Sequence, residues 1–129
     1  MTTAISVAII DNKRILLVKK KDTLILPGGK PEEGESDSAC LYREVGEELS
    51  GTRINPKTLE YFADFEGISP NKRLFTRVKV YLAELDSDVR GPSNEILDRD
   101  WFAYSEKCEY SLSNITNEII EALHNRSYF

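Results

Sequence analysis

Hydrophobic and polar residues are arranged along this chain in two different periods. Runs of β-branched and apolar residues, or apolar residues that alternate with polar ones, are typical of strands. Such segments occur at residues 4–10, 15–20, 23–26, 58–67, 73–85 and 101–105. In the segment 73–85, Val78, Val80 and Leu82 fall on one face of the predicted strand, because successive side chains of a strand alternate between its two faces.

Apolar residues recur at helical spacing in two other segments. The first predicted helix runs from Ser36 to Leu49, with Ser36 or Asp37 as its N-cap and Gly51 as its stop. A second helix is predicted over residues 111–126, capped by Ser111 or Ser113. Its apolar residues at helical spacing are Ile115, Ile119, Ile120 and Leu123.

The order of these elements is strands, helix, strands, helix. A turn at residues 11–14 makes the first two strands a hairpin, and Pro and Gly mark a loop at 27–35. Residues 86–94 form another loop. This order predicts an α/β (α+β) fold, in which helices pack on the faces of a mixed sheet. The 129 residues are enough for one domain.

Composition narrows the kind of partner. The net charge of −5 is unfavourable for binding a nucleic-acid polymer, which needs a basic surface, but a small phosphorylated ligand needs only a local basic patch. Cys40 and Cys108 are too few and too far apart for a disulfide framework. The N-terminal segment has neither the basic start of a signal peptide nor the length of a membrane span. We therefore expect a cytoplasmic protein without a membrane association.

Carboxylates are the main candidates for chemistry, because His124 is the only histidine of the chain. Glu44, Glu47 and Glu48 fall within an arc of roughly 100° on the first predicted helix. Like charges at this spacing repel each other. The cluster is either a solvated surface or a site for a hard divalent cation such as Mg²⁺, which prefers oxygen ligands.

The segment GKPEEGESDSACLYREVGEELSG at residues 29–51 resembles the Nudix box, Gly-x5-Glu-x7-Arg-Glu-U-x-Glu-Glu-x-Gly-U, where U is aliphatic. The matching positions are Gly29, Glu35, Arg43, Glu44, Val45, Glu47 and Glu48. The preceding LPGG and the later NEILDRDWF at 94–102 are also similar to the family. The end of the box differs, because Ser50 and Gly51 stand where Gly and an aliphatic residue are expected. We expect a helix exit that is one residue longer and stops at Gly51.

The resemblance implies a Nudix-type α/β/α sandwich and a hydrolase that cleaves a nucleoside diphosphate linked to another group. It implies that Glu44, Glu47 and Glu48 bind Mg²⁺, with Mn²⁺ as a substitute, and that one of them or another carboxylate is the general base. It further implies that Arg43 orients a glutamate. A backbone carbonyl of Gly28 or Gly29 would complete the metal shell, since glycine allows a loop to approach closely.

Several residues outside the box are candidates for binding substrate. Lys19 or Lys20 could contact phosphate, as the corresponding strand often does in the family, or could simply be a charged strand end. Glu95 is either an additional functional carboxylate or an exposed loop residue. The aromatic residues of segment 58–67 could stack on a nucleobase, although aromatic residues in a strand more often belong to the core. They are Tyr61, Phe62 and Phe65.

The short MutT-like length favours a (deoxy)nucleoside triphosphate, including an oxidised one, as the substrate. It would be cleaved to the monophosphate and pyrophosphate. ADP-ribose or a nucleotide sugar is the alternative substrate. An alternative of another class is a regulatory Nudix module that binds a nucleotide without hydrolysing it. Such modules usually lack some glutamates of the box, whereas this chain has all of them. Relatives are often dimers, so the resemblance also allows a homodimer.

Overall fold

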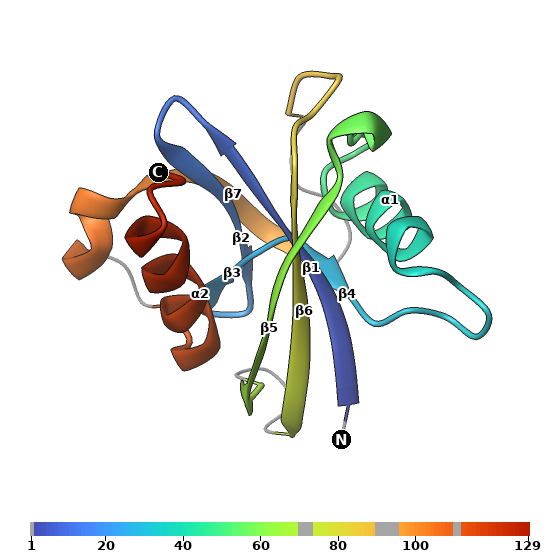
Figure 1. The fold of residues 1–129 in the computed structure, drawn as a ribbon, viewed down its shortest axis with the longest axis horizontal. Coiled ribbons are helices and arrows are strands. Elements are labelled where there is room, and N and C mark those ends of the chain that lie inside the picture. The colour runs from blue at the N-terminus through green and yellow to red at the C-terminus, as the bar shows by residue number, and fades with distance from the viewer. Residues whose placement is uncertain (1, 70–73, 90–95, 110–111) are drawn as a thin grey trace.

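The computed structural model describes residues 2–69, 74–89, 96–109 and 112–129, and its strands lie between two helices (Figure 1). The strands are β1 (Thr2–Asp11), β2 (Arg14–Lys20), β3 (Thr23–Ile25), β4 (Gly28–Gly29), β5 (Glu60–Ile68), β6 (Phe75–Ala83) and β7 (Ile96–Ala103). The helices are α1 (Asp37–Glu48), η1 (Pro56–Thr58), η2 (Tyr104–Glu109) and α2 (Asn114–Asn125), of which η1 and η2 are 3₁₀ helices. The predicted mixed sheet with helices on both faces is confirmed.

Strand β1 connects the two halves of the sheet. Its residues Thr2–Ile9 pair in parallel with β6, and β5 lies antiparallel to β6. At its other end β1 forms the predicted hairpin with β2, which pairs with both β3 and β7. The two hairpin-turn residues, Asn12 and Lys13, have φ of 50° and 60°, as the tight primed turns of hairpins require.

Two apolar layers, one on each face of the sheet, hold the helices in place. Helix α1 packs on the first face with Cys40, Leu41 and Val45, and α2 packs on the other with Ile119 and Leu123, among other residues. Val78, Val80 and Leu82 all belong to the α2 layer, as their alternation predicted. The sheet therefore presents an apolar surface to each helix, which is the arrangement of an α/β/α sandwich.

Several predicted boundaries differ from the structure. The strand expected at 101–105 is β7, which begins at Ile96 and ends at Ala103. Backbone pairing with β2 holds this strand from end to end, although its first half contains charged residues. Within the loop expected at 27–35, two glycines pair with β1 as β4. Helix α2 begins at Asn114 and not at residue 111, and its N-cap is Ser113, one of the two predicted caps. The other, Ser111, lies outside the described residues.

The expected longer exit of α1 is also wrong. The helix begins after its N-cap Ser36 and ends at Glu48, with Leu49 as its C-cap. Ser50 follows with a φ of 47°, and the N–H of Gly51 donates to the carbonyl of Gly46. This hydrogen bond is the six-to-one closure of a Schellman motif. Ser50 stands where the box has its glycine. It thus adopts the left-handed backbone conformation that glycine usually provides.

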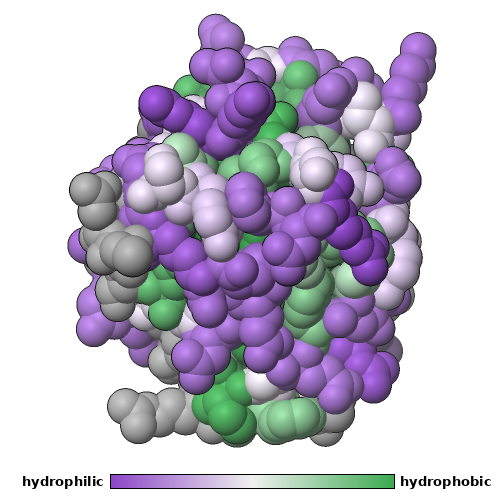
Figure 2. Space-filling view, turned by 60° about the vertical axis from the view of Figure 1, so that its left-hand side comes forward, coloured by the Kyte–Doolittle hydropathy of each residue, from purple (hydrophilic) through white to green (hydrophobic). Residues whose placement is uncertain are grey.

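The surface is mainly hydrophilic on the face that Figure 2 shows, and hydrophobic side chains gather at its lower edge. The end of β5 and the start of β6 lie at that level in Figure 1. Ile68, Leu74 and Phe75 are exposed apolar residues among those described there. Among the described residues, no helix has the length and apolar character needed to cross a membrane.

We expect Ser50→Gly to raise the free energy of unfolding by about 0.5–1 kcal/mol, because glycine adopts a positive φ without steric cost. Urea denaturation measures the effect. Ser50→Ala is the matched control, since it removes the hydroxyl but keeps the strained backbone. If Ser50→Gly is no more stable than Ser50→Ala, the left-handed conformation is not the cause.

Candidate active site

The loop before α1 is held against the helix by backbone contacts. Strand β4 pairs Gly28 with Ser6 and Gly29 with Ile5, which brings the loop onto β1. The N–H of Gly28 donates to Oε1 of Glu48 at 3.1 Å. A Cβ on Gly28 would lie 2.0 Å from the carbonyl oxygen of Ile5, so no other residue fits there without displacing the backbone.

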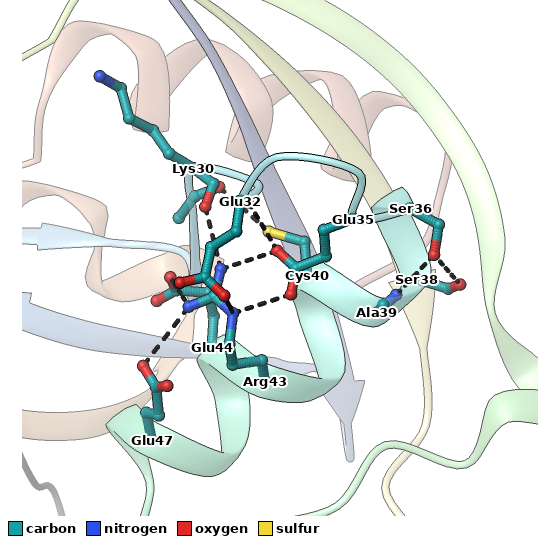
Figure 3. Close-up of polar contacts among 11 residues, drawn as sticks. Lys30, Glu32, Glu35, Ser36, Ser38, Ala39, Cys40, Arg43, Glu44 and Glu47 are labelled. Carbon is teal, nitrogen blue, oxygen red and sulfur yellow. Dashed lines mark hydrogen bonds and ion pairs between the residues drawn. The ribbon is translucent and has the colours of Figure 1, made fainter.

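Arg43 ties this loop to the carboxylates of α1 (Figure 3). Its Nε and Nη2 each donate to an oxygen of Glu35 at 2.9 Å, a bidentate pair. Its Nη1 donates to Oε1 of Glu44 at 2.8 Å and lies 3.6 Å from Oε2 of Glu47. Nη2 also donates to the carbonyl of Lys30 at 3.1 Å. One guanidinium therefore fixes the position of the loop and of Glu44 together.

The start of α1 has a second anchor on β6. Oη of Tyr81 donates to Oδ2 of Asp37 at 2.5 Å, and Nζ of Lys79 lies 2.9 Å from the same oxygen. The hydrogen bond from Tyr81 lowers the pKa of Asp37, with a further contribution from Lys79. Burial, together with Asp37, raises the pKa of Tyr81 to about 12. The helix is thus fixed to the sheet at its first turn.

The pKa values of two carboxyl groups that contact Arg43 are shifted in opposite directions. Hydrogen bonds from Arg43 and from the backbone of Glu32 lower the pKa of Glu35 to about 2. Burial raises the pKa of Glu44, although Arg43 opposes that shift. Glu35 is therefore held as an anion by its partners. The charged form of Glu44, by contrast, would be stabilised by any further positive charge beside it.

The three candidate metal ligands differ in exposure. Glu48 is 3% exposed, and the side chains of Glu44 and Glu47 are 15% and 49% exposed. Each carboxylate has a protein partner, and across the part of the chain that is described no three His, Cys, Asp or Glu side chains already form a group able to hold a metal ion.

The donor chemistry at this site still suits a hard cation. The three carboxylates supply oxygen ligands, as Mg²⁺ prefers. A Cβ on Gly29 would lie 2.5 Å from the carboxyl carbon of Glu44, so the glycine leaves the space that this carboxylate occupies. The residues therefore fit a divalent metal in the type of donor that they supply.

A pocket of about 390 Å³ opens beside Glu44. Its charged lining residues among those described are Lys20, Lys21, Lys30 and Glu44. The remaining lining residues are Thr2, Ala4, Ser6, Ile25, Leu26, Gly28, Gly29, Ser69, Thr76, Val78, Ile115, Thr116 and Ile119. The lysines provide a local basic patch on an otherwise acidic protein, which suits a phosphorylated ligand.

The structure brings only some of the predicted site residues to this pocket. Lys20, Glu44 and both glycines line it, whereas Lys19 is exposed outside it. Glu95 lies outside the described residues. Of the three candidate aromatic residues, Phe62 and Phe65 pack on the α2 layer, Tyr61 is half exposed, and none lines the pocket.

Sequence reasoning did not single out Lys21, Lys30, Thr76 and Thr116 as pocket residues. Lys21 has a φ of 57° at the turn between β2 and β3, a backbone conformation that its sequence does not signal. The threonines lie in segments whose apolar periodicity indicates only core. These positions come together through the tertiary fold.

Comparison with known proteins gives one family. The NUDIX domain family model matches residues 1–123 of the chain. No curated protein matches the chain by sequence. The structure is similar to that of a putative Nudix hydrolase family member from Chromobacterium violaceum, with 26% identity, a TM-score of 0.76, and coverage of 97% of this chain and 77% of that one.

Two further solved structures are similar. A MutT Nudix hydrolase from Burkholderia pseudomallei has 24% identity and a TM-score of 0.75, over 93% of this chain and 95% of that one. A UDP-X diphosphatase has 26% identity and a TM-score of 0.78, over 95% of this chain and 60% of that one.

We expect Glu35→Gln to lower the free energy of unfolding at neutral pH. The pKa of Glu35 is depressed in the folded protein, so its contribution is present above the unfolded pKa of about 4.3 and is lost as the pH falls towards 2. The stability difference between wild type and variant should therefore be largest at pH 7 and shrink below about pH 5.

Urea denaturation at a series of pH values measures this difference. Glu33→Gln, which changes an exposed residue of the same loop, is the control and should follow the wild-type pH dependence. A stability gap for Glu35→Gln that stays constant from pH 7 to pH 3 would contradict the role of the Arg43 pair.

Proposed function

The chain belongs to the Nudix family and is a hydrolase of phosphoric anhydride bonds, and we propose that it is a Mg²⁺-dependent pyrophosphohydrolase of nucleotides. Its substrate is a nucleoside diphosphate linked to another group, and a (deoxy)nucleoside triphosphate, oxidised or not, is our first choice. The products are the nucleoside monophosphate and pyrophosphate.

The observation that carries this proposal is the position of Glu44. Its carboxylate belongs to the acidic cluster of α1, and the same residue lines the pocket with Lys20, Lys21 and Lys30. A diphosphate placed between them would contact the lysines on one side and a metal held by the cluster on the other. Phosphate oxygens, carboxylates and Mg²⁺ commonly share such sites.

Glu44, Glu47 and Glu48 would hold the metal, and a backbone carbonyl of Gly28 or Gly29 would complete its shell. When bound, Mg²⁺ screens the phosphate charge and stabilises the charge that develops on the leaving oxygen. Arg43 holds Glu44 at the boundary of the pocket, and Glu35 holds Arg43. One carboxylate of the site takes the proton of the water that attacks phosphorus.

We expect Glu48→Gln to lower kcat/KM by about 100-fold or more while leaving the fold intact. The glutamine keeps an oxygen that accepts the hydrogen bond from Gly28, but it lacks the charge that binds the cation. Chromatography of the nucleotide products formed with Mg²⁺ measures the activity on every substrate class, and thermal melts followed by circular dichroism check the fold.

The panel contains common and 8-oxo nucleoside triphosphates, ADP-ribose, nucleotide sugars and diadenosine tetraphosphate. Glu60→Gln, an exposed glutamate at the start of β5, is the matched control and should keep wild-type activity. Metal-dependent turnover of triphosphates that is lost in Glu48→Gln supports the proposal. Turnover of ADP-ribose or nucleotide sugars alone would assign one of these, and not a triphosphate, as the substrate. Nucleotide binding without turnover across the panel would support a regulatory module instead.

A further inference from the structure

Two threonines line the pocket from elements that contribute none of its charged lining residues. Thr76 on β6 and Thr116 on α2 are only 6% and 3% exposed, yet both line the cavity. The charged lining residues come from elsewhere, namely the end of β2 and its turn, the loop after β4, and α1. A bound molecule that contacts the lysines with its phosphates would meet the threonines with its uncharged end.

The hydrogen bonds of these two hydroxyl groups leave them in different roles. The Thr76 hydroxyl donates its proton to the carbonyl of Leu74 at 3.0 Å, so it remains available as an acceptor. Oγ1 of Thr116 accepts from the Ser113 hydroxyl at 2.8 Å, so its own proton remains available for donation. The pocket therefore offers one acceptor and one donor whose directions are already set by the protein.

The fold brings the two residues to the same wall through a close contact at Gly67. Gly67 of β5 pairs with Thr76 of β6, and a Cβ at Gly67 would lie 2.8 Å from Cγ1 of Ile115. This glycine allows the first turn of α2 to rest on the sheet beside Thr76. Ile115, Ile119 and Val78 then supply apolar pocket surface beside the two hydroxyl groups.

We propose that Thr76 and Thr116 determine substrate specificity by binding the hydrogen-bonding edge of a nucleobase. On its Watson–Crick edge, each unpaired base presents an acceptor next to a donor, which matches one donor and one acceptor on the protein. Its apolar faces suit the aliphatic walls. This inference rests on the proposed function, because it assumes that the phosphates of the same nucleotide lie at the lysines.

The test compares Thr116→Val and Thr76→Val on three ligands with Mg²⁺: nucleoside triphosphates, ribose 5-triphosphate and inorganic tripolyphosphate. Valine has a similar shape but no hydroxyl. We expect kcat/KM for nucleoside triphosphates to fall about tenfold in each variant, and for the two ligands without a base to fall less than about threefold. Unlike general destabilisation, this effect depends on the base.

Thr58→Val is the matched control, because the Thr58 hydroxyl also donates to a backbone carbonyl but lies outside the pocket. It should retain wild-type kcat/KM for every ligand. Circular dichroism melts show whether each variant is folded. Gly67→Ala is a second probe, since displacement of Ile115 should move Thr116 and reproduce the base-dependent loss without removing a hydroxyl.

Each result decides between the two proposals. Suppose that the wild type hydrolyses nucleotides and that kcat/KM of the variants falls equally for ligands with and without a base. This result overturns the role of the threonines but leaves the hydrolase proposal intact. A loss as large for ribose 5-triphosphate as for the nucleotides assigns the threonines to the sugar and also overturns the inference. If wild type hydrolyses no nucleotide, calorimetric titration with nucleosides replaces turnover. If both variants then bind nucleosides more weakly than the wild type, the inference stands although the hydrolase proposal fails. If the wild type binds no nucleoside, both proposals are overturned.

Discussion

The site depends on how closely the backbone of β4 approaches α1. Gly28 donates its N–H to Glu48 and Gly29 leaves room for the carboxylate of Glu44, so two consecutive glycines meet two of the three carboxylates of the helix. Pairing of the same glycines with β1 fixes the loop to the centre of the sheet. A side chain at either glycine would separate the loop from the helix and would also disturb the pocket, because both glycines line it.

Clustering and burial of the carboxylates are unfavourable for the stability of the fold, and neighbouring residues offset this effect. Partly buried Glu44 has a raised pKa because burial disfavours its charged form, and Arg43 supplies the nearest positive charge. Arg43 is itself held by Glu35, whose charge is stable down to about pH 2. The arrangement keeps the acidic face of α1 in place at neutral pH while leaving it receptive to further positive charge. Local destabilisation of this kind is typical of functional sites.

The sequence predicted the fold class and the helix of the box well, because period and capping are local properties. Ser36 caps α1, and the alternation of Val78, Val80 and Leu82 places them in one core layer. It predicted β7 and the end of α1 poorly. Strand β7 is held by its pairing with β2 rather than by its own pattern, and Ser50 adopts a left-handed conformation that glycine usually provides. Both outcomes depend on tertiary contacts that outweigh local preference.

The pocket was the least predictable part, because its wall comes from segments that look like core. Ile115 and Ile119 follow the apolar period of α2, and both pack in the buried layer as well as lining the cavity. A period tells which face of a helix is buried but not whether a ligand or another side chain covers it. Gly67 makes the difference here, since it lets the first turn of α2 lie against β5. Thr116 is thereby buried beside a cavity, where its hydroxyl group is placed for the contact with a ligand that we propose.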